Sequence, residues 1–436
     1  MELFNKLGRE IESLWRDKNY NEEIFPALAA DALKRADMPS KVTPWEVLEW
    51  TLGQSELPPQ KDLSGNFGDP PITLFVAPRF YIDVYFWVDG TTQIHQHSFC
   101  GAFQVLLGSS IHSWYEFERR ESINKFTEIG DMSLKLCELL QTGEVQEILA
   151  GRQYIHSLFH LDQPSATIVV RTGQSPLSLP QYSYLKPYLA IDPFFDQQTV
   201  TKKIQCLNTL IRLKHPETDR LITELLKTSD FQTTFAILSA VRGHLQSNQL
   251  DQMFNLGTPQ ERFDKFLEIA RQRHGASSDI FPEIFAFREW QNEIVKRRSY
   301  VTSPDHRFFF ALLLNVEGRE RIFALIKQRF PKSEPIEMVL DWVFELGQTR
   351  VVGTNSPNAL GIEEFDDLDM FVLERLLKEE TDEQIRTSVN TEYSAEKSES
   401  VLAKLDGSLS KIRDAAIFRP LFAGPQAPSL QTSLAA

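Results

Sequence analysis

Hydrophobic residues recur at helical spacing along the first part of this chain. Leu3, Leu7, Ile11 and Trp15 follow one another at four-residue intervals, which places them on one side of a helix. We expect an N-terminal helical unit over residues 1–60, and we expect its apolar faces to cover a sheet.

The period of the pattern changes to two between residues 61 and 175. Short runs of alternating or β-branched residues are separated by turn signals such as Gly108-Ser109-Ser110. Because no helical pattern interrupts these runs, they predict an antiparallel β-barrel or sandwich. The expected strands cover residues 72–77, 80–88, 99–107, 112–118, 134–140, 145–149 and 166–171.

A helical period returns after a Pro-rich stretch at 176–200, which we interpret as a linker. Residues 201–380 carry helix-start signals such as Thr-Pro-Gln-Glu at 258–261, and they predict an all-helical domain. The run at 308–314 is apolar on nearly all sides, which indicates burial. Residues 381–436 are polar and then rich in small residues, so we expect a mobile tail with at most a short helix. The fold class is therefore predicted as α+β.

Composition excludes several classes of protein. The chain has 436 residues, of which 42% are hydrophobic, so it can bury at least one large core. Its net charge is −14 and no cluster of Lys and Arg is present, so we expect no nucleic-acid partner. No apolar stretch reaches the roughly 18 to 20 residues of a membrane span, and no signal peptide is apparent. With only three scattered cysteines, we expect a cytoplasmic protein without a membrane partner.

Three histidines provide the candidate chemistry. His95 and His97 are separated by one residue, so a strand would direct both imidazoles to the same side of a sheet. His156, on a later strand that pairs back across a small barrel, would complete three nitrogen ligands and leave coordination positions open. We therefore predict one metal ion per chain.

The spacing of these histidines resembles the two motifs of the cupin superfamily. In many cupins a glutamate ligand lies seven residues before the glycine that ends the first motif, and that position here is Gly101. The remaining three histidines resemble the ligand set of the iron-dependent thiol dioxygenases related to cysteine dioxygenase. The residues that carry the resemblance are Gly90, His95, His97 and Gly108 for the first motif, and Gly151 and His156 for the second.

The strand after the third ligand departs from the thiol dioxygenases. That family has Ser, His and Tyr at alternating positions, where this chain has Thr167, Val169 and Arg171. Because alternate residues share a face, Arg171 would point into the barrel, where a guanidinium suits a substrate carboxylate or phosphate. A register shift of one residue would turn Arg171 to solvent instead.

The resemblance implies a barrel of the cupin type that holds Fe(2+) and reacts with dioxygen. We expect a mononuclear non-heme iron oxygenase for a small anionic substrate, with an apolar pocket around the metal and with the helical domain partly covering the barrel mouth to exclude water. A second interpretation is a hydrolase, lyase or isomerase that uses Zn, Ni or Mn as a Lewis acid. A third is a ligand-sensing cupin whose helical domain binds a protein partner. A homodimer is left open.

Other residues have structural interpretations. We assign no role to His112, while His160 either orients His156 or is a half-exposed residue at a strand end. The alternating polar residues Tyr81, Asp83 and Tyr85 either line the pocket or meet the helical domain. The remaining candidates are Asp366, Asp367 and Asp369, which we interpret as helix-capping and solvated acids, and Cys100, which has the opposite parity to His97 and is interpreted as packing.

Overall fold

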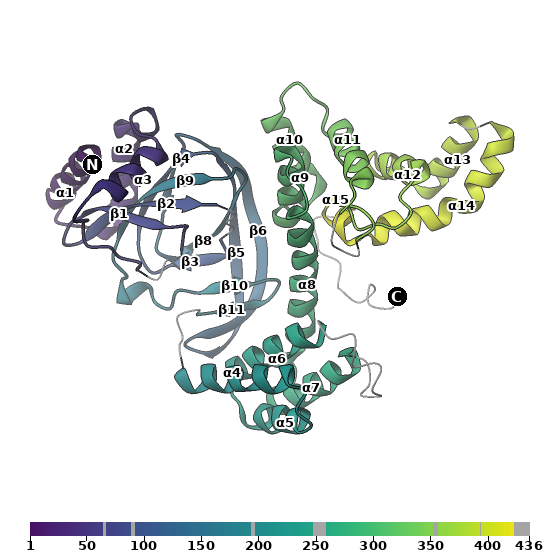
Figure 1. Cartoon of the computed structure of the whole chain (residues 1–436), viewed down its shortest axis with the longest axis horizontal. Coiled ribbons are helices and arrows are strands. Elements are labelled where there is room, and N and C mark those ends of the chain that lie inside the picture. Colours follow the sequence, from purple (N-terminus) through teal and green to yellow (C-terminus); the bar gives the residue numbers. More distant parts are fainter. Residues whose placement is uncertain are drawn as a thin grey trace.

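The computed structural model describes residues 1–63, 67–88, 92–192, 197–246, 259–351, 356–392 and 394–422. Helices at the N-terminus are followed by an antiparallel β unit and then by a long helical region, so the fold class is α+β (Figure 1). Gly90 of the first motif, Thr258 of the expected helix start and the chain from residue 423 lie outside the described residues.

The elements have the following bounds. The α-helices are α1 Glu2–Arg16, α2 Phe25–Ala36, α3 Pro44–Gly53, α4 Gln198–Arg212, α5 Thr218–Thr228, α6 Phe231–Gln246, α7 Pro259–His274, α8 Phe281–Arg298, α9 Pro304–Asn315, α10 Arg319–Arg329, α11 Pro335–Gln348, α12 Asp367–Leu377, α13 Asp382–Glu392, α14 Ala395–Asp414 and α15 Arg419–Phe422. The strands are β1 Pro71–Val76, β2 Phe80–Trp87, β3 His95–His97, β4 Gly101–Leu107, β5 Ser109–Asn124, β6 Thr127–Gln141, β7 Val145–Ile148, β8 Gly151–His160, β9 Ser165–Thr172, β10 Ser183–Leu185 and β11 Leu189–Ile191. Short 3₁₀ helices lie at Glu22–Ile24, Met38–Ser40, Pro176–Ser178, Gly275–Ile280 and Ala416–Phe418.

The strands form two sheets that face each other. The first sheet has the order β1-β2-β9-β4-β7, and the second has the order β10-β11-β6-β5-β8-β3. The second sheet closes on itself because β10 pairs with both β11 and β3. Phe103 and Val169 of the first sheet are buried in one cluster with Tyr154 and Leu158 of the second. The strands therefore enclose an interior.

The N-terminal helices cover the outer face of the first sheet. Phe4 and Ile11 of α1 are buried in the same cluster as Ile82 and Val170 of the sheet, whereas the neighbouring Val169 belongs to the interior. The side chains of β9 thus alternate between the helices and the interior, as a strand requires. The expectation that these helices cover a sheet is confirmed.

Two short strands lie in the segment 176–200, where the sequence indicated a linker. Strands β10 and β11 join the second sheet through β3 and β6, and Tyr184 and Leu189 are buried within it. Strands of three residues beside prolines offer too few alternating positions to be recognised by their period. The barrel therefore continues to Ile191.

The segment from residue 381 is largely helical in its described part, so the expectation of a mobile tail is wrong up to residue 422. Helices α13 and α14 bury Ile385, Val389, Leu405 and Ile412 in the main helical core. Many charged residues lie between these apolar residues, so the composition of the segment is polar. Their spacing of four and seven nevertheless places each pair on one helix face.

The apolar run at 308–314 packs on the wall of the barrel. Residues 308–313 are fully buried in a cluster that includes Ile111 and Phe159 of the second sheet. Phe159 follows His156 by three positions on β8, so the two side chains point to opposite sides of the sheet. Burial is confirmed. Of the two partners that the sequence left open, the other helices or the barrel mouth, the run takes the other helices, and it also contacts the outer face of the sheet.

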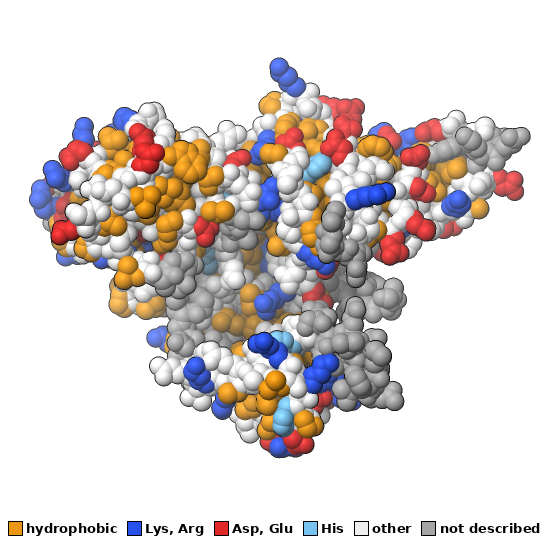
Figure 2. All heavy atoms as spheres, viewed as in Figure 1, with side chains coloured by type: hydrophobic (Ala, Val, Ile, Leu, Met, Phe, Trp, Pro, Cys, Tyr) orange, Lys and Arg blue, Asp and Glu red, His pale blue; other side chains and the backbone are white. Residues whose placement is uncertain are grey.

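The surface in Figure 2 shows several acidic side chains along the C-terminal helices, with basic side chains scattered between them. Hydrophobic side chains are most extensive over the N-terminal helices and the neighbouring barrel in this view. None of the described helices has both the length and the apolar character that a bilayer crossing requires.

Candidate metal centre

The three predicted ligands meet inside the barrel. His95 and His97 lie on β3 and His156 lies on β8, with His95 and His156 as register partners. All three are buried, and their candidate ligand atoms lie within 4.8 Å of one another. Within the described ranges, no other histidines, cysteines, aspartates or glutamates form such a group.

Burial keeps these imidazoles neutral. It lowers the pKa of His95 below its ordinary value of 6.5, and it lowers the pKa of His97 and His156 well below that value. The Arg171 guanidinium lowers the pKa of His95 and His97 further, because it disfavours a second positive charge nearby. A neutral imidazole offers the lone pair that a metal ion needs.

The geometry of the nitrogens fits a metal ion. Nε2 of His97 lies 2.9 Å from Nε2 of His156, and two nitrogen ligands at about 2.1 Å from an ion and at a right angle are about 3 Å apart. Nδ1 of His95 lies 2.7 Å from the carbonyl oxygen of Gln93. Since a carbonyl only accepts, this Nδ1 carries the proton and Nε2 is free to bind. Nδ1 of His97 has no hydrogen-bond partner among the described residues.

A chain of hydrogen bonds behind His156 orients the third ligand. Nδ1 of His156 lies 3.1 Å from Nε2 of His112, and Nδ1 of His112 lies 2.9 Å from the Glu138 carboxylate. A carboxylate accepts only, so His112 Nδ1 carries a proton, His112 Nε2 accepts from His156, and His156 Nε2 remains for the metal. Tyr154 and Trp114 also pack on the His112 ring, with ring centroids 5.9 and 5.6 Å from it.

The orienting role that we considered for His160 belongs to His112. His160 lies four positions after His156, where its Nδ1 contacts the hydroxyls of Ser110 and Ser165 at 3.0 and 2.8 Å. It is 2% exposed, so it is not a half-exposed residue at a strand end either. His112 was missed because it reaches His156 across the β5–β8 ladder, which no local spacing in the sequence reveals.

Replacing Glu138 with Gln is expected to weaken metal affinity by about 10- to 100-fold without abolishing binding. The substitution removes the negative charge that holds the proton on His112 and thereby fixes the tautomer of His156. Competition with a chelator of known affinity measures the effect. Glu147→Gln, at an exposed position of β7, is the matched control and should leave the affinity unchanged. Equal affinities for the two variants would show that the chain of hydrogen bonds does not support the ligand.

The absence of a glutamate ligand has a steric cause. A Cβ atom at Gly101 would lie 2.0 Å from the carbonyl oxygen of Val170 and 2.9 Å from Cα of Arg171. Gly101 is the register partner of Arg171, so the neighbouring strand occupies the space that a side chain would need. The three histidines are therefore the complete set that this part of the sheet can provide.

Arg171 faces the interior, as its parity predicted. Its guanidinium carbon lies 3.2 Å from the centroid of the Phe99 ring and 5.4 Å from that of Tyr81. Its Nε atom is buried and has no hydrogen-bond partner among the described residues. Arg171 as a whole is half-buried, and a guanidinium with a free Nε donor on the interior can receive the carboxylate or phosphate of a substrate.

The polar residues of β2 line the same interior. Asp83 is 3% exposed and accepts a hydrogen bond from the Tyr85 hydroxyl at 3.1 Å, while its Oδ1 has no partner among the described residues. Burial raises the pKa of Asp83, and its hydrogen bonds and Arg171 oppose this effect. Tyr81 pairs with Arg171 across the ladder. The sequence left open whether these residues line the pocket or meet the helical domain, and the structure shows that they face the barrel interior.

Aromatic side chains keep the chamber apolar. Phe99 lies 4.4 Å from the ring of His97, and Phe103 and Trp87 are buried in the same interior cluster. The aromatic residues that we expected near the metal therefore do line the interior.

The interpretation of Cys100 is confirmed, and that of the acidic cluster is confirmed in part. Cys100 is buried among the residues that face the N-terminal helices, away from the ligands. The Asp366 carboxylate accepts from the backbone N–H groups of Leu368 and Asp369, so it caps α12. Asp369 is not a solvated acid, because it is fully buried and forms an ion pair with Lys411 at 2.8 Å.

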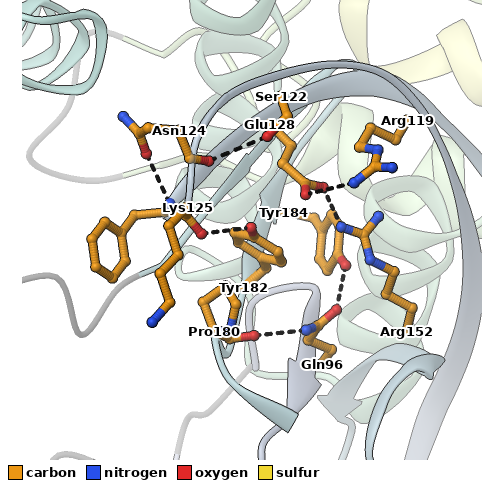
Figure 3. A network of polar contacts seen from close by, with 11 residues as sticks. Gln96, Arg119, Ser122, Asn124, Lys125, Glu128, Arg152, Pro180, Tyr182 and Tyr184 are labelled. Carbon is orange, nitrogen blue, oxygen red and sulfur yellow. Dashed lines mark hydrogen bonds and ion pairs between the residues drawn. The ribbon is translucent and has the colours of Figure 1, made fainter. Parts of the chain in front are cut away.

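A polar network supports the ligand strand from behind (Figure 3). Gln96 lies between the two ligands of β3, donates to the carbonyl of Pro180 at 2.8 Å and accepts from the Tyr184 hydroxyl at 2.6 Å. Glu128 is 4% exposed and pairs with Arg152 and Arg119. The network ties the short strand β3 to β10, so the two histidines are held by more than their own ladder.

Comparisons with known proteins give matches in solved structures only. No family model and no curated protein matches the sequence. A cupin-2 domain protein from Shewanella frigidimarina is 14% identical over 31% of this chain and 99% of its own, with a TM-score of 0.19. The capsular polysaccharide assembling protein CapF from Staphylococcus aureus is 16% identical over 35% of this chain and 42% of its own, with a TM-score of 0.21. One chain from the crystal structures of the DMSP lyases RdDddP and RnDddQII is 14% identical over 37% of this chain and 78% of its own, with a TM-score of 0.21.

The barrel itself identifies its fold. Two facing antiparallel sheets carry a His-x-His strand and a third histidine on the strand that pairs with it. The barrel has the cupin fold. Two motif glycines of this cupin barrel, Gly108 and Gly151, have φ values of 82° and 71°, which residues with a Cβ rarely adopt.

Proposed function

We propose that this chain is a mononuclear non-heme iron cupin oxygenase that acts on a small anionic substrate and dioxygen. The observation that carries the proposal is the set of three neutral imidazoles without a carboxylate, on the same buried interior that holds the Arg171 guanidinium. Three neutral ligands would leave a divalent ion its full charge and up to three open positions.

The residues around the site divide the work. Fe(II), when bound by His95, His97 and His156, would supply the redox chemistry that dioxygen requires. Arg171 would hold the anionic group of the substrate and so fix the distance of its reactive end from the histidines. The aromatic wall around Phe99 would exclude water from the chamber.

A non-redox reaction with Zn, Ni or Mn is the second candidate, and Asp83 favours it. This carboxyl group lies in the same interior, its Oδ1 has no partner among the described residues, and burial raises its pKa. A carboxylate placed in this way can act as a general base. A hydrolase, lyase or isomerase would use such a base beside a Lewis acid.

The metal and the oxygen demand separate the two candidates. The full chain would be reconstituted anaerobically with Fe(II) or Zn(II) and mixed with small thiols, amino acids and phenolic acids in an oxygen electrode. We expect oxygen uptake with at least one substrate, with iron only and without 2-oxoglutarate. Equal turnover with zinc, or turnover without oxygen, would favour the Lewis-acid reaction.

Replacing Arg171 with Gln is expected to raise the KM for the anionic substrate by about 10- to 100-fold, because a charge-assisted hydrogen bond of roughly 1.5–3 kcal/mol is lost. The value of kcat should change less, since the guanidinium holds a group distant from the reacting atoms. Arg171→Lys should recover part of the loss. Steady-state kinetics gives both constants, and an unchanged KM in the glutamine variant would remove Arg171 from the binding site.

A further inference from the structure

A second cavity lies between the outer face of the barrel and the helices that pack on it. It has a volume of about 280 Å³. The barrel contributes Gln93 before β3, Tyr115 on β5, Ser157 on β8 and Tyr184 on β10, while α8 and the end of α9 form the other side. Ser157 has the opposite parity to His156, so a layer of sheet separates this cavity from the metal chamber.

The cavity is lined by two cations and by no acid. Arg288 of α8 and Lys186 after β10 are the charged lining residues, although the whole chain has a net charge of −14. Lys186 forms an ion pair at 2.5 Å with Glu317, which does not line the cavity. Arg288 is exposed at the mouth of the cavity and has neither a hydrogen bond nor an ion pair among the described residues, and partial burial lowers its pKa. The Arg288 guanidinium at the mouth therefore has no acidic partner in the part of the chain that the structure describes.

Neutral donors surround this unpaired charge. Gln291 and Asn292 follow Arg288 on α8 and line the same cavity. An apolar wall of Leu185 and Val295 completes it. Small-molecule sites typically combine an apolar wall with a few convergent polar groups, in volumes of roughly 300–1,000 Å³. At about 280 Å³, the cavity is slightly smaller than this range and suits a ligand of few atoms.

We propose that this cavity binds a small organic anion, with its carboxylate or phosphate on Arg288 and with Lys186 as a second cation. A planar guanidinium binds either group through two parallel hydrogen bonds. The site is distinct from the metal chamber, and it does not depend on which reaction the metal performs.

The cavity also connects to the metal ligands. Gln93 lines it and accepts the Nδ1 proton of His95. Tyr184 lines it and donates to Gln96, which stands between the two ligands of β3 (Figure 3). An anion in the cavity would therefore touch the groups that orient the metal-binding strand, and the helical region would supply the charge that recruits it.

Calorimetric titration of the full-length chain tests the proposal. The probes are inorganic phosphate, phosphoglycolate and succinate, which separate a free phosphate from an organic phosphate or carboxylate. We expect saturable binding of at least one organic probe, weakened at least tenfold by Arg288→Gln and partly recovered by Arg288→Lys. Arg271→Gln, an exposed residue of α7, is the charge-matched control and should bind normally.

Two further variants separate this cavity from the metal chamber. Binding should persist in His97→Ala and in Arg171→Gln, because neither residue lines the second cavity. The proposal is overturned if only inorganic phosphate binds, if no probe binds in the millimolar range, or if Arg288→Gln binds as well as the wild type. Loss of binding in Arg171→Gln with retention in Arg288→Gln would place the anion in the barrel interior instead.

Discussion

Replacing His97 or His156 with Ala is expected to abolish stoichiometric metal binding. Each substitution removes one of three nitrogens that lie within 4.8 Å of one another, and no carboxylate can replace it at Gly101. Two remaining imidazoles are too few for a stable mononuclear site. Elemental analysis of protein purified without oxygen gives the metal content per chain.

The control for these variants is His160→Ala. His160 lies on the same strand and the same face as His156, four residues further on, and it is also buried. It should retain the metal content of the wild type, and circular dichroism should show that all the variants are folded. Full metal content in both the His97 and the His156 variant would show that the ligand assignment is wrong.

Phe309→Ala is expected to lower the free energy of unfolding by about 3–5 kcal/mol, which is typical for a buried phenylalanine. The Phe309 side chain is fully buried and its ring centroid lies 5.5 Å from that of Trp342. Chemical denaturation followed by fluorescence or circular dichroism measures the change.

An exposed phenylalanine of the neighbouring helix provides the comparison for this substitution. Phe344 is 49% exposed, so Phe344→Ala should change the stability by about 0.5 kcal/mol or less. If the two alanine variants are equally stable, the run at 308–314 does not form the core that joins the helices to the barrel.

Most of the confirmed predictions rest on the alternation of side chains between the two faces of a strand. It placed His95, His97 and Arg171 on the interior and Cys100 on the opposite side, because the period of two is a local property that the chain displays directly. The same argument separated helical from β segments, since both periods extend over many residues.

Features that depend on register could not be predicted in this way. His112 reaches His156 only because β5 pairs with β8, and the pairing of distant strands is not encoded in local spacing. For the same reason the alternation of Tyr81, Asp83 and Tyr85 left two sides open. The sequence also left open which surface the apolar run at 308–314 packs against. An apolar pattern indicates that a side chain is buried, but it does not identify the residues around it.

Strand β8 contributes to two cores at once. Its inner face carries His156, and its outer face carries Phe159, which is packed with the helices. We therefore expect a disturbance of the helical core to reach His156 through this single strand, although the three candidate ligands all lie on strands. Heating should release the metal as these helices unfold. The metal content at each temperature would then report on the folding of the helical region, although that region supplies none of the three ligands.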